Sequence, residues 1–356
     1  MSRQAFLIAF LIFAVCGAVR AQWEMESSGT TADLRGIDNV GGGVAWASGT
    51  NGTVLRTEDG GYLWQACAVP PGAEHLDFRG VQAFDANTAI VMSSGKGDLS
   101  RLYKTTDGCH TWKLVFTNPD KDGFWDAVML NRYDSDGFVL GDPVNGRFSF
   151  WETSDKGATW TKSNVPGLEA LTNEAAFAAS NSSLLVEEAF AIGFVTGGAK
   201  EVRVFLMQDD ESFRSFRVSL QSMSSSSGAF SISVRDDYRW VVVGGNFLIP
   251  SDRYRTASYT RDGGKTWLAA QTPPHGYRSA VAYDAASKTW ITVGPNGTDI
   301  STDDGKNWRA LHPDPAMHES PDADREWNAL SLPFVVGPHG RIGKLNAKAL
   351  TMNAGK

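Results

Sequence analysis

The chain has 356 residues, of which 42% are apolar and 21% charged, and its formal net charge at pH 7 is −7. This length exceeds the usual size of one hydrophobic core, so the sequence specifies either two domains or one large closed β architecture. The acidic balance argues against a nucleic-acid partner, which would favour a basic face.

Residues 1–21 have the pattern of a secretory signal peptide: Arg3 precedes an apolar run over 5–15, and small residues end at Ala21. We expect cleavage near Ala21 and a protein that is secreted or periplasmic. Cys16 leaves a lipoprotein signal as an alternative, although the residues before it match a lipobox poorly. Cleavage removes two basic residues and no acidic one, which brings the net charge to −9. No later apolar run approaches the ~20 residues of a membrane helix, so no membrane span is expected.

An eight-residue turn pattern occurs five times. Each copy has Ser or Thr, then Asp two residues later, usually Gly two further on, and Trp three after that. The Asp and Trp positions are Asp59, Trp64, Asp107, Trp112, Asp155, Trp160, Asp262, Trp267, Asp303 and Trp308. The carboxylate can accept backbone N–H bonds inside a tight turn, the Gly can supply a positive φ, and the Trp can bury a large apolar surface between neighbouring sheets. These residues are therefore predicted to be structural.

Two copies depart from this pattern. Cys109 takes the Gly position in the second copy, which predicts an altered or strained turn. A weakened copy at 207–216 keeps Asp209 but lacks the Gly and the Trp. If the compartment is oxidising, Cys67 and Cys109 could pair, but the sequence does not show whether they lie close enough.

The spacing of the turns predicts the architecture. Successive Trp residues lie 48, 48, 107 and 41 residues apart, and the long interval holds the weakened copy. Two strand-like runs precede each turn, one follows it, and the run that opens the next unit makes four strands per repeat. A period of about 40–50 residues with four strands per unit is typical of a β-propeller.

Seven units open near residues 34, 78, 124, 174, 229, 277 and 326. The seventh ends after 341–345 without an outer strand, whereas the mature chain begins with a Trp and a lone strand-like run. We expect residues 22–29 to complete the last unit as its outer strand, which would leave no free sheet edge. The predicted fold is all-β: a single seven-bladed β-propeller over 22–346, followed by a C-terminal tail at 347–356.

The turns resemble the Asp-box, or BNR, repeat of sialidases and sortilin-type receptors, within the wider group of WD40/YVTN-like propellers. The segments LRGIDNVGGGVAWASGTNGTVLRTEDGG, VLGDPVNGRF and VGPNGTDISTDDGKNW are more similar to bacterial propellers of the photosystem II stability and assembly factor family. This resemblance covers roughly 22–346 and implies seven blades and a non-catalytic, protein-binding role. The arginine patch associated with the photosynthetic factor matches only scattered arginines here, so a photosystem partner is not carried over.

Alignment of the unit openings predicts a ring of residues around the mouth of a channel. The aligned column reads Arg35, Arg79, Trp125, Ala175, Phe230, Arg278 and Trp327. Arginines and tryptophans would suit an anionic or aromatic group there, because guanidinium groups bind carboxylates through two hydrogen bonds and stack on rings. Glu174 joins this candidate binding set. The alternative is that the arginines pair with carboxylates such as Glu174, Asp38 or Asp126 and only solvate the mouth.

Loops between second and third strands share this predicted face. Their charged candidates are Arg101, Asp142, Arg147, Arg253 and Arg255. The loop at 246–255 is the longest, and its apolar tip at 247–250 next to arginines suits a protein contact. We therefore predict a monomeric scaffold that binds a protein partner through this face, with an anionic or carbohydrate ligand as an additional option. Joint replacement of Arg35, Arg79 and Arg278 is expected to weaken partner binding without lowering the melting temperature.

A sialidase-like glycoside hydrolase is the alternative function. Asp126, Asp142 and Glu174 could supply catalytic carboxylates, but the early Phe/Tyr-Arg-Ile-Pro motif is missing. No G-x-G-x-x-G stands between a strand and a helix, so a dinucleotide-dependent redox enzyme is not supported. Two thiols without a CxxC and scattered histidines do not predict a metal site. The sequence therefore assigns no catalytic residue, cofactor or metal.

Overall fold

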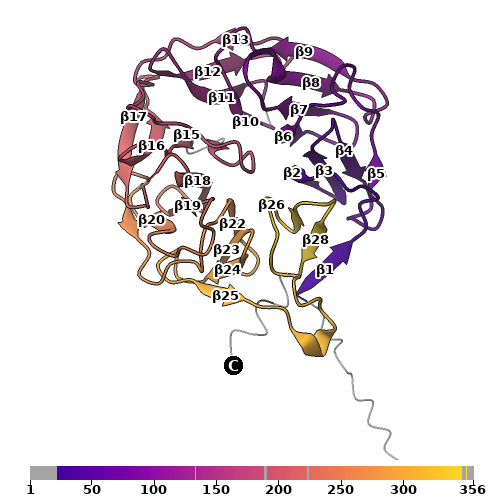
Figure 1. Ribbon diagram of the computed structural model, residues 1–356. Coiled ribbons are helices and arrows are strands. Elements are labelled where there is room, and N and C mark those ends of the chain that lie inside the picture. The colour runs from indigo at the N-terminus through magenta and orange to yellow at the C-terminus, as the bar shows by residue number, and fades with distance from the viewer. Residues whose placement is uncertain (1–21, 133, 188–190, 223, 347–349, 351–356) are drawn as a thin grey trace, which may run out of the picture.

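The computed structural model describes residues 22–132, 134–187, 191–222, 224–346 and 350. The chain forms seven four-stranded antiparallel sheets arranged radially around a common centre (Figure 1). The predicted all-β, seven-bladed propeller is therefore confirmed. The proposed signal peptide and nearly all of the proposed C-terminal tail lie outside the described residues. Within the described part of the chain, no helix has the length and apolar character to span a bilayer.

Each sheet is built from strands that follow one another in the chain, except the last. The first three sheets are β2 (Leu34–Gly41), β3 (Val44–Gly49), β4 (Val54–Thr57) and β5 (Gln65–Ala66); β6 (Phe78–Ala83), β7 (Ala89–Ser93), β8 (Arg101–Thr105) and β9 (Lys113–Thr117); and β10 (Trp125–Leu130), β11 (Gly137–Val144), β12 (Arg147–Thr153) and β13 (Thr161–Lys162). The next three are β14 (Leu184–Glu187), β15 (Ala191–Val195), β16 (Val202–Met207) and β17 (Phe213–Val218); β18 (Ser227–Val234), β19 (Trp240–Asn246), β20 (Ala257–Thr260) and β21 (Leu268–Ala269); and β22 (Ala280–Asp284), β23 (Thr289–Gly294), β24 (Gly297–Ser301) and β25 (Arg309–Leu311). The seventh holds β26 (Ala329–Ser331), β27 (Phe334–Val336), β28 (Ile342–Leu345) and β1 (Trp23–Glu26), and short 3₁₀ helices lie at Gly97–Leu99 and Pro315–Met317.

The first strand of the chain closes the ring. β1 pairs with β28 from Trp23 opposite Leu345 to Glu26 opposite Ile342, and the two strands run side by side in Figure 1. The Glu319 carboxylate fixes the start of β1, because it accepts the Trp23 backbone N–H at 2.9 Å. The prediction that the N-terminal segment is the outer strand of the last sheet is confirmed.

The five repeated turns share one hydrogen-bond pattern. Each Ser or Thr hydroxyl donates to the Asp at 2.7–2.9 Å and accepts the backbone N–H four residues after itself at 2.9–3.1 Å. Each Asp accepts a further backbone N–H four residues on, at 2.9–3.0 Å. The carboxylates of the repeated aspartates are thus engaged in hydrogen bonds within their own turns. These turns connect the third and fourth strands.

The second turn keeps this pattern although Cys109 replaces glycine. Cys109 donates its N–H to the Thr105 hydroxyl at 3.1 Å, so the turn is not altered in its hydrogen bonds, but its φ of 65° agrees with the expected strain. A left-handed backbone is unfavourable for a residue with a Cβ atom. The side chain forms a disulfide with Cys67, with 5.3 Å between the Cα atoms. That bond joins the first sheet to the turn of the second.

Seven apolar clusters fill the joints between neighbouring sheets. Each cluster contains one aromatic residue that stands just before, or at the start of, an outer strand. In order around the ring these are Trp64, Trp112, Trp160, Phe213, Trp267, Trp308 and Trp23. Phe213 takes the place of tryptophan in the weakened fourth repeat, and Trp23 supplies the last joint from the N-terminal strand.

Closure of the ring should depend on pH through Glu26. Burial raises the pKa of Glu26 to about 7, although its Oε2 accepts the Trp64 indole N–H at 2.7 Å. Because the folded-state pKa lies above the unfolded one, stability is lost as pH rises from about 4.5 through 7. Glu26→Gln retains the acceptor and removes the charge, so we expect its melting temperature to exceed that of the wild type near pH 8 and to match it near pH 4.

The matched control is Glu24→Gln, an exposed position on the same strand. Thermal unfolding followed by circular dichroism at both pH values measures the effect. A gain that is equal at the two pH values, or equal in the two variants, would show that the Glu26 charge does not oppose closure.

Candidate functional site

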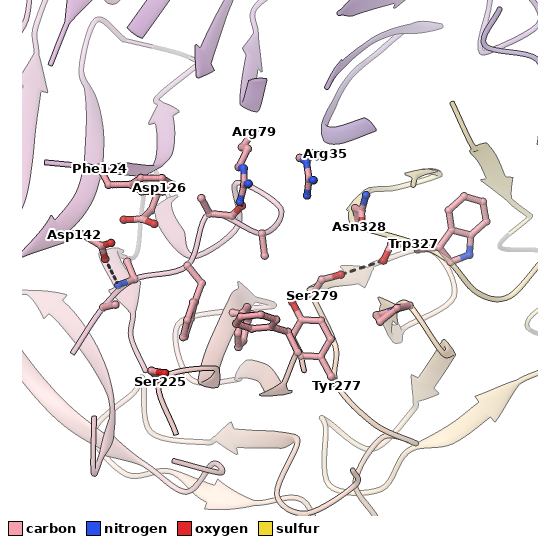
Figure 2. A pocket seen from close by; sticks show the side chains of 18 residues that line it. Arg35, Arg79, Phe124, Asp126, Asp142, Ser225, Tyr277, Ser279, Trp327 and Asn328 are labelled. Carbon is pink, nitrogen blue, oxygen red and sulfur yellow. Dashed lines mark hydrogen bonds between the residues drawn. The ribbon is translucent and has the colours of Figure 1, made fainter. Parts of the chain in front are cut away.

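A cavity of about 530 Å³ opens at one end of the ring. It lies where the inner strands begin and the second strands end, so it is on the face opposite the repeated turns. Figure 2 shows its lining converging from several sheets. Six lining residues hold equivalent places at the start of the inner strand of six sheets, and together they form what we call the mouth ring: Arg35, Arg79, Asp126, Phe230, Ser279 and Asn328.

The residue before each member of the mouth ring is fully buried. These residues are Leu34, Phe78, Trp125, Ala229, Arg278 and Trp327, each with 0% exposure. In four sheets the pairing of first and second strands is interrupted by a register shift at the mouth-ring residue, which is the arrangement of a β-bulge. The aligned column proposed from the sequence is therefore displaced by one residue in the third, sixth and seventh sheets.

The displacement takes Trp125 and Arg278 out of the cavity lining and turns the indole of Trp327 away from the cavity. Trp125 stacks on Phe116 with ring centroids 5.3 Å apart. Trp327 stacks on Trp23 at 5.7 Å, and Figure 2 shows that it offers the cavity its carbonyl group while the indole points away. Neither indole is placed to meet a ligand in the mouth.

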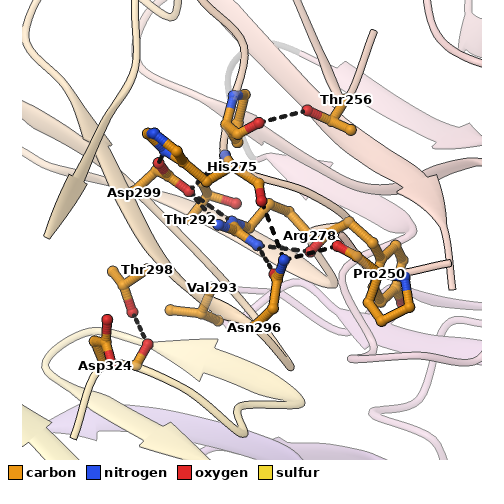
Figure 3. Close-up of polar contacts among 12 residues, drawn as sticks. Pro250, Thr256, His275, Arg278, Thr292, Val293, Asn296, Thr298, Asp299 and Asp324 are labelled. Atoms are coloured by element: carbon orange, nitrogen blue, oxygen red, sulfur yellow. Dashed lines mark hydrogen bonds and ion pairs between the residues drawn. The ribbon is translucent and has the colours of Figure 1, made fainter. Parts of the chain in front are cut away.

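Arg278 is a structural cross-link. Its guanidinium donates to the Asp299 carboxylate, to the Tyr277 carbonyl at 2.8 Å and to Asn296 (Figure 3). The Asn296 amide in turn donates to the carbonyl of Pro250 at 2.8 Å. This network fixes the long loop of the fifth sheet to the sixth, so replacement of Arg278 is now expected to lower stability, contrary to the sequence-based expectation.

The basic side of the cavity consists of Arg35 and Arg79. Both pair with Asp77, at 3.1 Å and 2.8 Å, and Arg79 also donates to the Ala178 carbonyl at 3.2 Å. Both guanidinium groups remain partly exposed. The alternative that the arginines pair with carboxylates is thus observed for Arg35 and Arg79. Their partner is Asp77 rather than Glu174, Asp38 or Asp126, and the two arginines share its carboxylate.

The acidic side consists of Asp126 and Asp142. Burial and the neighbouring Asp142 charge raise the pKa of Asp126 well above its ordinary value, although Arg79 opposes the shift. Burial also raises the pKa of Asp142 to about 6, against a hydrogen bond from the Ala176 N–H at 3.1 Å. Two carboxyl groups with raised pKa values therefore lie along one wall (Figure 2).

Residues 175–183, which we call the channel segment, cross the centre of the ring. Asn181 bonds both backbone groups of Val128 at 2.9 Å in the third sheet, and Ser180 donates to the Ser279 carbonyl at 2.7 Å in the sixth. Ser182 donates to the Ser231 hydroxyl at 2.7 Å in the fifth. An isolated antiparallel bridge pairs Ala175 with Gly197, as expected for a unit that opens near residue 174, but the continuous inner strand of the fourth sheet begins only at Leu184.

Aromatic rings form the third side. Phe177 of the channel segment stacks on Phe230 with centroids 4.0 Å apart and planes inclined by 9°. Tyr277 and Phe247 meet the Phe230 ring edge-on at 4.7 Å and 6.1 Å. The cavity thus has a basic side, an acidic side and an aromatic side, which are positioned by strands, by the hydrogen-bonded channel segment and, for Phe247 and Tyr277, by loops.

The remaining sequence candidates are dispersed. Glu174 is buried and paired with Arg203, with a bond of 2.9 Å to its Nε. Arg101 donates to the Asp98 carbonyl at 2.6 Å, and Arg147 pairs with Glu169 at 3.0 Å. Only Asp142 of the loop candidates lines the cavity.

Arg253 and Arg255 are exposed on the loop at 246–255. The Arg255 guanidinium lies over the ring of Tyr254 at 5.3 Å. The tip of the same loop reaches the cavity, because Phe247 is part of its lining.

The sequence reasoning missed the channel segment and Phe177. The signal was present as the run AAFAASNSS, which has small residues, no strand alternation and several amide or hydroxyl side chains. Small side chains fit a narrow centre, and Asn or Ser can satisfy backbone groups that have no strand partner. Asp77, the shared partner of both arginines, carried no comparable signal.

These features define a seven-bladed propeller with a three-sided cavity at its mouth. Neither a protein-family profile nor a curated sequence matches the chain. Solved structures share the fold over 92% of this chain. They include YCF48 bound to D1 peptide, with TM-score 0.62, 15% identity and 99% of that chain covered, and YCF48 from Cyanidioschyzon merolae, with TM-score 0.60, 17% identity and 100% covered. The WD40 propeller domain of Doa1 matches with TM-score 0.59, 13% identity and 98% covered.

At these identities the likeness establishes architecture alone. The chain therefore has the fold of the assembly-factor propellers that the sequence resembles.

The acidic side should make the fold less stable as pH rises. The folded-state pKa of Asp142 is about 6 and the unfolded one about 3.9, so stability falls through that window and stays low above it. Asp142→Asn keeps the oxygen that accepts the Ala176 N–H. We expect it to raise the free energy of unfolding by at most about 3 kcal/mol near pH 8 and by nothing near pH 4.

Chemical denaturation at the two pH values measures this difference. Asp98→Asn, at an exposed position, is the control and should leave the stability nearly unchanged at both. A loss of stability near pH 8 in Asp142→Asn would refute the account.

Proposed function

We propose that this chain is an exported, non-catalytic Asp-box propeller that binds a protein partner through the face carrying the cavity. One observation carries the proposal. Phe247, Leu248 and Ile249 are exposed by 44%, 71% and 53%, and this apolar tip is continuous with the cavity lining. Large exposed apolar side chains beside a cavity, held on a rigid scaffold, mark a contact surface.

The Arg278 network strengthens the argument. It holds the backbone of Pro250 through Asn296, so the tip is presented in a fixed position. A fixed tip costs less conformational entropy on binding than a mobile one. The fold agrees with this role, since a propeller of the same architecture has been solved with a D1 peptide bound.

Export is part of the same proposal. The signal-like residues 1–21 support it, and so does the Cys67–Cys109 disulfide, because such bonds persist mainly in oxidising compartments.

The test is affinity capture from an envelope extract with the wild type and with Leu248→Ser/Ile249→Ser, followed by titration of the purified partner. We expect the double variant to bind at least about tenfold more weakly, since two buried apolar side chains are lost from the contact. Leu268→Ser, at an exposed leucine on the outer strand β21, is the matched control and should bind normally. A partner that binds all three proteins equally would contradict the proposed contact face.

Glycoside hydrolysis is the second candidate, and only the acid pair favours it. A carboxyl group kept protonated near neutral pH can act as a general acid beside a second carboxylate. Incubation with a panel of fluorogenic glycosides near pH 5 and pH 7 tests this, with Asp126→Asn as the inactive control. Release that persists in Asp126→Asn, or no release at all, would remove the candidate.

A further inference from the structure

The carboxyl group of Asp126 is buried without a hydrogen-bond donor for one of its oxygens. The residue is 1% exposed, it lines the cavity, and its Oδ2 has no partner among the described residues. Buried polar atoms in folded proteins are nearly always paired, and leaving one unpaired is costly. An unpaired oxygen in the wall of a cavity indicates that the missing donor belongs to a ligand.

The charges around the cavity show what kind of donor is missing. Arg35 and Arg79 already share the carboxylate of Asp77, which leaves that side with an excess of one positive charge. Among the described residues, no basic side chain forms an ion pair with Asp126 or Asp142. Arg79 acts on the Asp126 charge, but it is engaged by Asp77 and Ala178. The acid pair therefore lacks a donor for the Asp126 Oδ2 and a basic partner to balance its charge.

We propose that Asp126 and Asp142 form a socket for a lysine side chain of the protein partner. This inference rests on the proposed function and adds the chemistry that the cavity recognises. An ammonium group has three donors and no acceptor, so it can serve the free Asp126 oxygen and Asp142 together. Its positive charge also balances two carboxylates that oppose each other's ionisation.

The rest of the cavity suits the body of the same side chain. The stacked Phe177 and Phe230 rings offer an apolar wall for the four methylene groups. Long basic side chains commonly lay their stems on such surfaces while the charged end meets polar groups. Arg79 on the neighbouring sheet and Arg35 beyond it would repel a second cation, which limits the socket to one basic group.

Binding should be linked to the release of a proton. The titratable groups that face the socket are Asp126, Asp142, Asp77, Arg35, Arg79 and Tyr277; Glu174 is nearby but paired with Arg203. The pKa of Asp142 is raised to about 6 and that of Asp126 well above its ordinary value, so the empty pair binds a proton more readily than two exposed carboxyl groups do. An arriving ammonium group favours the doubly ionised pair and displaces that proton.

The experiment uses blocked amino acids, so it does not require the partner to be known. N-acetyl-lysine methylamide and the norleucine and glutamate analogues are titrated into the whole chain by calorimetry, in two buffers of different ionisation enthalpy. We expect the lysine probe to bind at least about tenfold more tightly than norleucine near pH 8, to release a proton, and to weaken near pH 5. The glutamate probe should bind more weakly than norleucine.

Two variants and one control complete the design. Asp126→Asn and Asp142→Asn should each lose the preference for lysine over norleucine, and both should remain folded because each removes a charge that opposes folding. Glu74→Gln removes an exposed acid from a neighbouring loop and should leave the preference intact. Should Asp126→Asn fail to fold, Asp142→Asn alone decides.

The outcomes separate this inference from the proposed function. Equal binding of lysine and norleucine, tighter binding of glutamate, or a lysine preference that survives Asp142→Asn would overturn the socket. Capture of a partner that depends on Leu248 and Ile249 would still stand in each of those cases. Conversely, lysine binding without such a partner would refute the contact surface and assign the socket to a small amine.

Discussion

Burial of one aromatic side chain in each joint between sheets is the constraint on which the rest of the structure depends. Each sheet has two apolar faces that would be exposed to water if the sheet stood alone, so it needs a neighbouring sheet on both sides. An aromatic side chain buries about 150–250 Å² and packs in a preferred orientation, so it helps to fix how two sheets meet. The outermost position of the last sheet is filled from the other end of the chain, and Trp23 brings the aromatic that the seventh joint needs. β1 therefore closes the ring in two ways: it pairs with β28, and it buries Trp23 in the seventh joint.

The cavity is a consequence of closure and of small residues at the centre. A Cβ atom on Gly80 would lie 2.7 Å from the Asn181 Oδ1, which accepts the Val128 N–H, so the channel segment needs glycine at that position. Residues 175–179 of the channel segment line the cavity at the mouth of the ring. Asp126 and Asp142 are buried in the wall of this cavity, and burial raises the pKa values of both carboxyl groups.

The sequence predicted what depends on local chemistry. The Thr–Asp–Gly–Trp pattern predicts the hydrogen bonds inside each turn. The lone strand-like run after Trp23 predicts the outer strand that the last sheet lacks. The sequence does not predict features that depend on a register shift of one residue or on partners far away in the chain. Trp125 was aligned with Arg35 because both open an inner strand, but the bulge makes Asp126 the equivalent residue, and a shift of one residue reverses the direction of a side chain. The fourth unit opens near residue 174, where Ala175 bridges Gly197, but the channel segment before β14 bonds to four other sheets, and no local pattern reveals those distant partners.

The same groups bear on stability and on binding at the mouth. Arg278 shows how this fold treats a charge that it buries for structural reasons: the guanidinium has partners for each of its nitrogens, and Asp299 balances its charge. Asp126 is buried to a similar degree and has no such set. Removing a charged group from water is unfavourable unless a partner compensates, so a structural role would have favoured asparagine at that position. Arg278 has a hydrogen-bond partner for each nitrogen, which is what a structural cross-link requires. Asp126 has an oxygen without a partner and lines a cavity, which is what the proposed ligand site requires.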